Sequence, residues 1–325
     1  MDGSHPRRRT EEASAWRGRP LETEGTPRAL AWGNSGVLAS AWAREGRSDH
    51  AVWYDAELNV ATSVDVSGSV KSLRWLKDGH LLVVGDDLVA EGWMAAKIDN
   101  SGVTEGIVLP ASVVQVLSVD VSADGCAALG CRSAWDTGLL VVIDVETGVV
   151  SEQVDMEAGP ITSVAWSSRG LVAAGYRDRT DGSSVMTVWY PRRGTPIVQF
   201  VTLSRHADAT AVWSSRDELA WGWREVDDQG NELAVISIWS PKGDGRARTL
   251  GKFSGWVGSV AWSPSGELAV GGWHADSGRG VAVWGSGRRP KGAPVTEHPV
   301  VHVAWSRDSR LAVAGPGGEL AIWHR

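Results

Sequence analysis

Residues 259–284 read SVAWSPSGELAVGGWHADSGRGVAVW, and this stretch sets out a unit that recurs along the chain. Alternating residues lead to Trp262, a polar turn follows, and an apolar run begins at Leu268. After a charged loop, a third alternating segment closes on Trp284. Period-two alternation is typical of β-strands, because successive side chains of a strand point to opposite faces. The stretch therefore predicts three short consecutive strands.

The same frame fits six further stretches, one of which carries Val121 and Ile143 where the others carry tryptophans. The first of the two positions defines seven anchors: Trp32, Trp75, Val121, Trp166, Trp213, Trp262 and Trp305. Successive anchors lie 43, 46, 45, 47, 49 and 43 residues apart. A period in this range, with several short strands per unit, predicts the blades of a β-propeller.

The composition agrees with a large all-β core and excludes several classes of protein. Of 325 residues, 42% are apolar and 22% charged, which excludes a disordered chain. The net charge of -7 argues against a general nucleic-acid or membrane-surface binder, since either would show a basic excess. Apolar runs such as residues 81–84 are too short for a membrane-spanning helix. Tryptophan dominates the aromatic residues, with 19 Trp against 3 Tyr and 2 Phe.

A fourth, outer strand is expected in each unit. Weaker candidates are 60–64, 149–154, 197–202 and 247–250. The sequence stops two residues after Trp323, so the last unit has no outer strand of its own. We therefore predict that a strand between Ala13 and Thr23 supplies it, with Trp16 and Leu21 packing onto the last blade, because an open ring would leave an unpaired edge.

The predicted fold class is thus all-β: a seven-bladed β-propeller of four-stranded antiparallel blades, closed by an N-terminal strand. We expect residues 1–12 to form a disordered polar tail and residues 13–325 to form a single propeller domain.

The layout resembles the WD-repeat family of seven-bladed propellers over roughly residues 26–325, most closely in residues 259–284. Two features depart from that family. The Gly-His pair that precedes the inner strand is missing, and the closing tryptophan is not followed by aspartate. The residues found there are Tyr54, Tyr190, Ser240, Gly285 and His324. We therefore expect the family's internal hydrogen-bonded tetrad to be absent, with indole packing in its place.

Two sets of aromatic residues call for different interpretations. The anchor and closing tryptophans recur at fixed positions and are best explained as packing between blades. A second set lies near the ends of the second strands or in the charged loops that follow, which share one face of a propeller. The candidate binding residues are Trp42, Arg44, Trp93, Trp135, Tyr176, Arg177, Asp178, Trp223, Arg224, Trp256, Trp273 and His274.

Aromatic and arginine side chains gathered on one face match the composition of protein-binding hot spots. The alternative is that these aromatics only fasten long loops to their own blades, and that the charges form a solvated rim. Both interpretations remain open at the level of sequence.

Signals for catalysis are few. The chain has no Gly-rich phosphate loop and no Gly-x-Ser-x-Gly elbow. The sequence contains a paired-aspartate motif formed by Asp86, Asp87 and Glu91. It is like the motifs that hold magnesium-diphosphate in prenyl-chain enzymes, although here an acidic turn is the simpler interpretation. Cys126 and Cys131 lie five apart on one predicted strand and face opposite ways, so we expect no disulfide between them.

The leading hypothesis is a non-catalytic scaffold that binds a partner protein or peptide on the top face, where the second-to-third-strand loops emerge. The alternative is a small-molecule binder or enzyme with an aromatic, acid-lined axial pocket, for which magnesium-diphosphate or a carbohydrate would be the ligand. We predict no cofactor for the scaffold, with magnesium only in the alternative. We also predict a cytoplasmic monomer that binds neither nucleic acid nor membranes.

Overall fold

Each of the seven predicted units begins with an innermost strand that ends at its anchor. In the computed structural model these strands are β2 (Thr26–Trp32), β6 (Ser69–Trp75), β10 (Val113–Val121), β14 (Ile161–Trp166), β18 (Thr210–Trp213), β21 (Arg248–Trp262) and β25 (His302–Trp305). The structure describes residues 16–21, 23–88, 94–191, 196–202, 210–226, 229–275, 277–285, 290–292, 296 and 298–324. All regular elements in these ranges are strands, which confirms the all-β prediction.

The second and third strands of the units follow in sequence order. The second strands are β3 (Leu38–Ala43), β7 (Leu81–Asp86), β11 (Cys126–Ser133), β15 (Val172–Arg177), β19 (Leu219–Val226), β22 (Leu268–His274) and β26 (Leu311–Ala314). The third strands are β4 (Asp49–Tyr54), β8 (Ala95–Asp99), β12 (Gly138–Asp144), β16 (Ser184–Trp189), β20 (Glu232–Trp239), β23 (Arg279–Trp284) and β27 (Leu320–His324). In the described ranges, no helix is long and apolar enough to cross a bilayer.

The outer strands are the least regular. They are β5 (Val60–Val66), β9 (Gly102–Gly106), β13 (Val150–Met156), β17 (Pro196–Thr202), β24 (Pro290–Gly292) and the N-terminal β1 (Arg17–Leu21). The four predicted outer segments all fall in strands, three of them in β5, β13 and β17 and the fourth at the start of β21.

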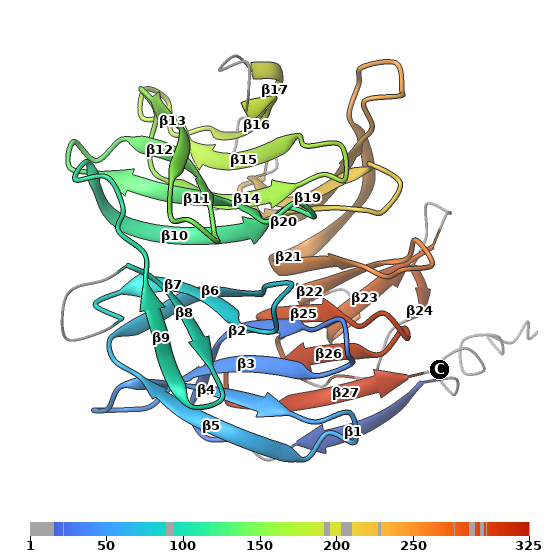
Figure 1. The fold of residues 1–325 in the computed structure, drawn as a ribbon. Helices are drawn as coiled ribbons and strands as arrows, with labels where there is room; N and C mark the ends of the chain where they lie inside the picture. Colours follow the sequence, from blue (N-terminus) through green and yellow to red (C-terminus); the bar gives the residue numbers. More distant parts are fainter. Residues whose placement is uncertain are drawn as a thin grey trace, which may run out of the picture.

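Hydrogen bonding joins these strands into six antiparallel sheets, so the prediction of seven separate blades is wrong. Five sheets have the predicted four strands, in the orders β2-β3-β4-β5, β6-β7-β8-β9, β10-β11-β12-β13, β14-β15-β16-β17 and β1-β27-β26-β25. The sixth runs from β18 to β24 and contains seven strands. In Figure 1 the sheets follow one another around the molecule in sequence order.

The long strand β21 is the reason for the difference. Its first half pairs with β20 as an outer strand, and its second half pairs with β22 as an innermost strand. The change of partner occurs at Gly255, whose φ of 129° is rarely adopted by other residues. A Cβ on Gly255 would lie 1.7 Å from the carbonyl oxygen of Trp273. Glycine therefore lets one continuous strand pass from the fifth predicted unit into the sixth.

The predicted N-terminal closing strand is confirmed. Strand β1 pairs antiparallel with β27, with Arg17 opposite His324 and Leu21 opposite Leu320. The two strands lie side by side in Figure 1, blue beside red. Trp16 is 7% exposed and packs against Trp305, with ring centroids 6.0 Å apart. The pairing covers an edge that would otherwise be open. The predicted tail, residues 1–12, lies outside the described residues.

The hydrophobic core lies between neighbouring units. Between the first two, Trp53 packs among the alanines of β3 and the apolar side chains of β6 and β7. The closing tryptophans Trp53, Trp189, Trp239 and Trp284 are all buried. Each buried indole removes about 150–250 Å² from water. Their predicted role in packing between blades is therefore confirmed.

Three anchor indoles also make a polar contact across this boundary. The Nε1–H of Trp75 donates to the carbonyl oxygen of Ala31 at 3.0 Å, and that of Trp213 donates to Ala165 at 3.1 Å. Trp32 donates to Ala304 at 3.1 Å. The acceptor in each case is the residue just before the anchor of the preceding unit. A repeated residue thus fastens each of these innermost strands to its neighbour.

Replacing Trp16 with alanine tests the closing strand. The substitution removes a buried indole from the contact with Trp305 and should lower the free energy of unfolding by about 3–5 kcal/mol, measured by urea denaturation. The matched control is Trp135→Ala, because the Trp135 side chain is largely exposed and its loss should leave stability unchanged within about 0.5 kcal/mol. Equal stabilities of the two variants would show that Trp16 does not hold the ring closed.

A pair of tryptophan-to-phenylalanine substitutions tests the indole hydrogen bond. Trp75→Phe removes the donor to Ala31 and should cost about 0.5–1.5 kcal/mol beyond the change in ring size. Trp166→Phe makes the same change in size, but the buried Nε1–H of Trp166 has no hydrogen-bond partner among the described residues. The second variant should therefore be the more stable of the two in urea unfolding, and the reverse order would contradict this role.

Candidate binding site

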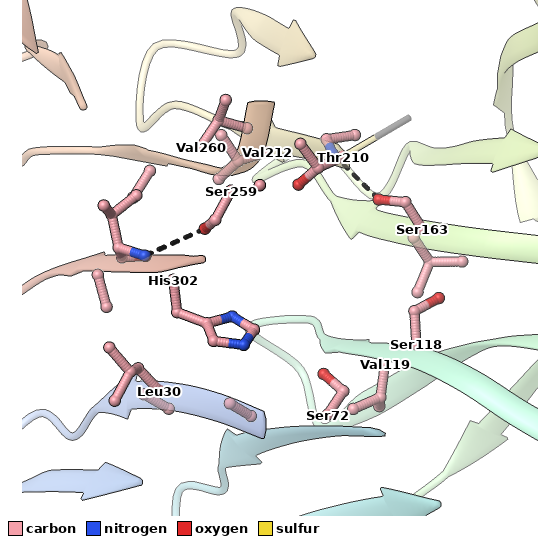
Figure 2. A pocket seen from close by; sticks show the side chains of 18 of the residues that line it. Leu30, Ser72, Ser118, Val119, Ser163, Thr210, Val212, Ser259, Val260 and His302 are labelled. Carbon is pink, nitrogen blue, oxygen red and sulfur yellow. Dashed lines mark hydrogen bonds between the residues drawn. The ribbon is translucent and has the colours of Figure 1, made fainter. Parts of the chain in front are cut away.

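A cavity of about 660 Å³ lies at the centre of the ring. Residues from all seven innermost strands line it, together with Trp223 and Arg224 of β19. Figure 2 shows the cavity from close by, with side chains from several strands around a common space. Its volume falls within the range of about 300–1,000 Å³ that is usual for small-molecule sites.

A layer of polar side chains surrounds the cavity at one repeat position, three residues before the anchor. Five units carry a hydroxyl there: Ser72, Ser118, Ser163, Thr210 and Ser259. The Oγ of Ser163 accepts a hydrogen bond from the backbone N–H of Ala211 at 3.0 Å, and the Oγ of Ser259 accepts one from Val303 at 3.2 Å (Figure 2). These two hydroxyls fasten one innermost strand to the next.

The sequence interpretation missed this layer, although the signal was present. Setting the anchors in register also aligns the residues three positions earlier, and these are small and polar in most units. The remaining two units carry Ala29 and His302.

A break in strand pairing lies beside the polar layer. In five innermost strands the register shifts just before this position, as between Pro27 and Ala29 or between Val70 and Ser72. A bulge of this kind inserts an unpaired residue and re-aims its side chain. The inserted residues include Arg28 and Lys71, and both line the cavity.

The lining of the cavity is basic. Arg28, Lys71, Arg74, Arg224 and His302 all contribute to it, and none of the lining residues among those described is an aspartate or glutamate. Among the described residues, the axial cavity is therefore lined by cations where the alternative hypothesis expected acids.

Two carboxylates outside the cavity lining pair with the basic side chains. Asp86 Oδ2 lies 3.2 Å from Lys71 Nζ. Asp120 Oδ1 lies 2.9 Å from Arg74 Nε, and its other oxygen accepts the backbone N–H of Trp166. The cations are thus held in place by acids that do not themselves face the cavity.

His302 occupies the place of the hydroxyl in the last unit. Its imidazole points into the cavity in Figure 2. The pKa of His302 is lowered to about 4, mainly by burial and also by the charge of Arg28, while a hydrogen bond with the Pro27 backbone acts in the opposite direction. The imidazole is therefore neutral at pH 7.

Three predicted binding residues are buried and contact neighbouring side chains of their own sheets. Trp42 donates from Nε1 to Ser40 Oγ at 2.5 Å within the core. The hydroxyl of Tyr176 lies 3.1 Å from Thr187 Oγ1. His274 stacks on Phe253, with ring centroids 3.9 Å apart. The burial of Trp42, Tyr176 and His274 supports a packing role for these three side chains.

Other predicted residues reach the surface or the cavity. Trp223 and Arg224 line the axial cavity, and Trp223 Nε1 donates to Ser237 Oγ at 3.1 Å. Trp256 and Trp273 are half-buried and lie opposite each other in the pairing of β21 with β22.

The remaining charged candidates lie in loops or, for Arg177, at the end of a strand. Arg44 forms an ion pair with Asp65. Asp178 accepts the backbone N–H of Thr180 at 2.7 Å and so shapes its own loop. Arg177 is exposed. Trp93 lies outside the described residues.

The paired-aspartate motif does not form an open metal site. Asp86 pairs with Lys71 and also accepts a hydrogen bond from Gln115 Nε2 at 3.0 Å. Asp87 follows in a left-handed turn with φ of 52°, and Glu91 lies outside the described residues. Within the described ranges, no three His, Cys, Asp or Glu side chains are grouped so that they could hold a metal ion.

Trp135 is the most exposed of the large apolar residues described, at 82%. It lies in the turn between β11 and β12, where its backbone N–H donates to Ser133 Oγ at 3.1 Å. Its carbonyl oxygen accepts a hydrogen bond from Arg179 Nη1 at 3.1 Å. Arg179 comes from the loop between β15 and β16 of the neighbouring sheet. The structure thus brings Trp135 together with the loop that follows Arg177, the last residue of β15.

Comparison with known proteins identifies the fold. No family model and no curated protein matches the chain. Among solved structures, a chain of the hydrazine synthase of Kuenenia stuttgartiensis has a TM-score of 0.73 at 15% identity, with 93% of this chain and 96% of that chain covered.

Two further neighbours come from protein assemblies or propeller domains. A chain of the mitotic checkpoint complex has a TM-score of 0.68 at 18% identity and covers 100% of this chain and 97% of its own. The β-propeller domain of Cps50 (Swd1) from Myceliophteria thermophila has a TM-score of 0.65 at 18% identity, with 94% and 99% covered. At these identities the likeness establishes the propeller fold, in agreement with the resemblance to WD-repeat propellers.

The lowered pKa of His302 predicts a pH dependence of stability. Histidine in the unfolded chain titrates near pH 6.5, so between that value and about 4 the unfolded state binds more protons than the folded state. The contribution of His302 to the free energy of unfolding is therefore intact above pH 6.5 and falls as the pH is lowered toward 4.

The variant His302→Ser, which carries the side chain found at equivalent positions, isolates this effect. Urea unfolding of both proteins is measured at pH 7 and pH 4.5. The free energy of unfolding should fall more for the parent than for the variant. Protonation of carboxylates lowers it in both proteins, so the difference reports on His302. Parallel losses in the free energy of unfolding would contradict the lowered pKa of His302.

Proposed function

We propose that this protein is a non-catalytic recognition scaffold that binds a partner protein or peptide on the face where second and third strands are joined. The observation that carries this proposal is the exposed indole of Trp135. Water-exposed tryptophan is uncommon, since its ring is among the largest apolar groups in proteins. Tryptophan is also among the residues most enriched at the energetic centres of protein interfaces.

The turn that presents Trp135 is held rigid by bonds on both sides. Ser133 binds its backbone N–H within the same sheet, and Arg179 binds its carbonyl from the neighbouring sheet. Arg179 also reaches the carbonyl of Asp136 at 3.4 Å. A side chain whose backbone is already ordered loses little conformational freedom on binding, which favours affinity.

The charges around Trp135 support a polar rim. Arg132 lies 3.9 Å from Asp136, and both side chains are exposed. Arg177 is exposed in the adjacent sheet, at the end of β15. An apolar centre surrounded by arginine and carboxylate side chains is the usual arrangement of a protein-binding patch. Propeller chains of similar fold occur in protein assemblies such as the mitotic checkpoint complex, which supports this class of function by analogy.

The setting that we propose is a monomer in the cytoplasm. Cys131 is a buried thiol on β11, and burial raises its pKa, so it stays protonated and unreactive. A buried thiol of this kind suits a reducing compartment.

Trp135→Ala tests the recognition patch. Proteins captured from the native cell extract by the parent chain would be identified, and the affinity of the purified partner would be measured by calorimetry. Removing the indole should weaken binding at least about 30-fold, which corresponds to about 2 kcal/mol. Thermal unfolding of the variant should be unchanged.

The matched control is Ile197→Ala on the outer strand β17, which also removes an exposed apolar side chain but lies away from the turn. This variant should bind like the parent. If Trp135→Ala bound the partner with parental affinity, the patch around Trp135 would not be the site.

A further inference from the structure

Three basic side chains approach one another at the axial cavity. Arg28 lies on β2, Lys71 on β6 and His302 on β25, and β2 is in contact with both other strands around the axis. The electrostatic couplings agree with this closeness. The charge of Arg28 acts on His302, and the charges of Arg28 and Lys71 both act on Asp49. Arg28 therefore lies near both His302 and Asp49, Lys71 also lies near Asp49, and all three side chains line the cavity.

Arg28 retains hydrogen-bonding capacity toward the cavity. Only its Nε approaches a carboxylate, at 3.7 Å from Asp49 Oδ2. Within the described part of the chain, its two terminal nitrogens make no hydrogen bond, and the side chain is 41% exposed. A guanidinium presents five N–H donors in a planar fork, so most of them remain available.

Two polar contacts fix the position of the Lys71 ammonium group, and one of its N–H donors remains available. Its Nζ lies 3.2 Å from Asp86 Oδ2 and 3.4 Å from Ser69 Oγ. An ammonium group has three protons, which leaves one beyond these two contacts. Gln115 holds Asp86 from the neighbouring sheet, so the ammonium is fixed by a chain of polar contacts before any ligand arrives.

The carboxylates that pair with these cations do not face the ligand space. Asp49 is 4% exposed and accepts the backbone N–H of Val70 at 2.8 Å. Neither Asp49 nor Asp86 belongs to the cavity lining. An anion inside the cavity therefore meets N–H and O–H donors first, although the chain as a whole carries a net charge of -7. The protein walls strengthen this field relative to open solvent.

From this geometry we propose that the axial cavity binds a small phosphate-bearing molecule, with Arg28 and Lys71 as its main donors. A phosphate offers several acceptor oxygens, and the fork of arginine binds two of them at once. Ser72 and the neutral imidazole of His302 lie beside this position and supply further polar contacts. The cavity of about 660 Å³ has room for an organic group attached to the phosphate.

Titration of the full chain with inorganic diphosphate by calorimetry tests this site. The parent should bind one diphosphate per chain, and its affinity should decrease as salt is added. Arg28→Gln and Lys71→Gln should each weaken binding at least about 10-fold, because each removes a charge-assisted hydrogen bond. Lys71→Gln keeps Asp86 bonded to Gln115, so it tests the proposal even if Arg28→Gln destabilises the fold.

The control is Lys252→Gln, which also takes a lysine from an ion pair, here with Glu225 at 2.5 Å, but on the outer part of β21 outside the cavity lining. It should bind diphosphate like the parent. The proposal is overturned if the parent shows no binding at millimolar diphosphate, or if Arg28→Gln and Lys71→Gln both bind as the parent does. Binding of a neutral disaccharide without diphosphate would equally overturn it, because the cavity would then be a carbohydrate site. Trp135→Ala should bind diphosphate normally, so this test and that of the recognition patch can fail separately.

Discussion

The contact between the anchor indole of one unit and the innermost strand of the unit before it holds the ring together. A single four-stranded sheet cannot bury either of its faces alone, so each unit depends on its neighbours. The anchor supplies apolar area and, in three units, an N–H donor to a backbone carbonyl. The bond from Trp32 to Ala304 joins residues 272 positions apart and so connects the first unit to the last. Together with the pairing of β1 and β27, it makes closure part of the same repeated contact.

Closure determines what the innermost strands can do. Because each is fastened to its neighbours, the strands cannot spread apart or collapse, and a cavity of fixed outline remains at the axis. Small hydroxyl residues suit this position, since two of them bridge to the next backbone without filling the space, as Ser163 and Ser259 do. The bulges beside them leave Arg28 and Lys71 outside the ladder of hydrogen bonds and free to face inward. The polar cavity is therefore a consequence of the contacts that join neighbouring innermost strands into a ring.

Spacing of the tryptophans was enough to predict the strands, their order and the closing strand, because each depends on a periodic pattern. The number of separate sheets was not predictable, since it depended on a single backbone angle at Gly255. The sequence also did not show which aromatic residues are exposed to solvent. Trp42 lies within β3 opposite His50 and is buried, whereas Trp135 lies two residues beyond the end of β11 and is exposed. Asp86, which was expected at the axis, lies at the end of β7 and pairs with Lys71, an inner-strand cation that sequence alone does not place beside it.

The same construction separates two kinds of recognition. Trp135 is carried by a turn outside the hydrogen-bonded ladder, so that surface can vary without disturbing the packing between sheets. Arg28 and Lys71 lie on innermost strands, and any ligand between them touches two neighbouring sheets at once. Such a ligand binds only the closed ring, because the unfolded chain does not hold the two side chains together, and by mass action it stabilises the ring. A partner bound at Trp135 and an anion bound at the axis would therefore act on the scaffold in different ways. The partner would act through the contacts of one turn, and the anion through the contacts between neighbouring sheets that close the ring.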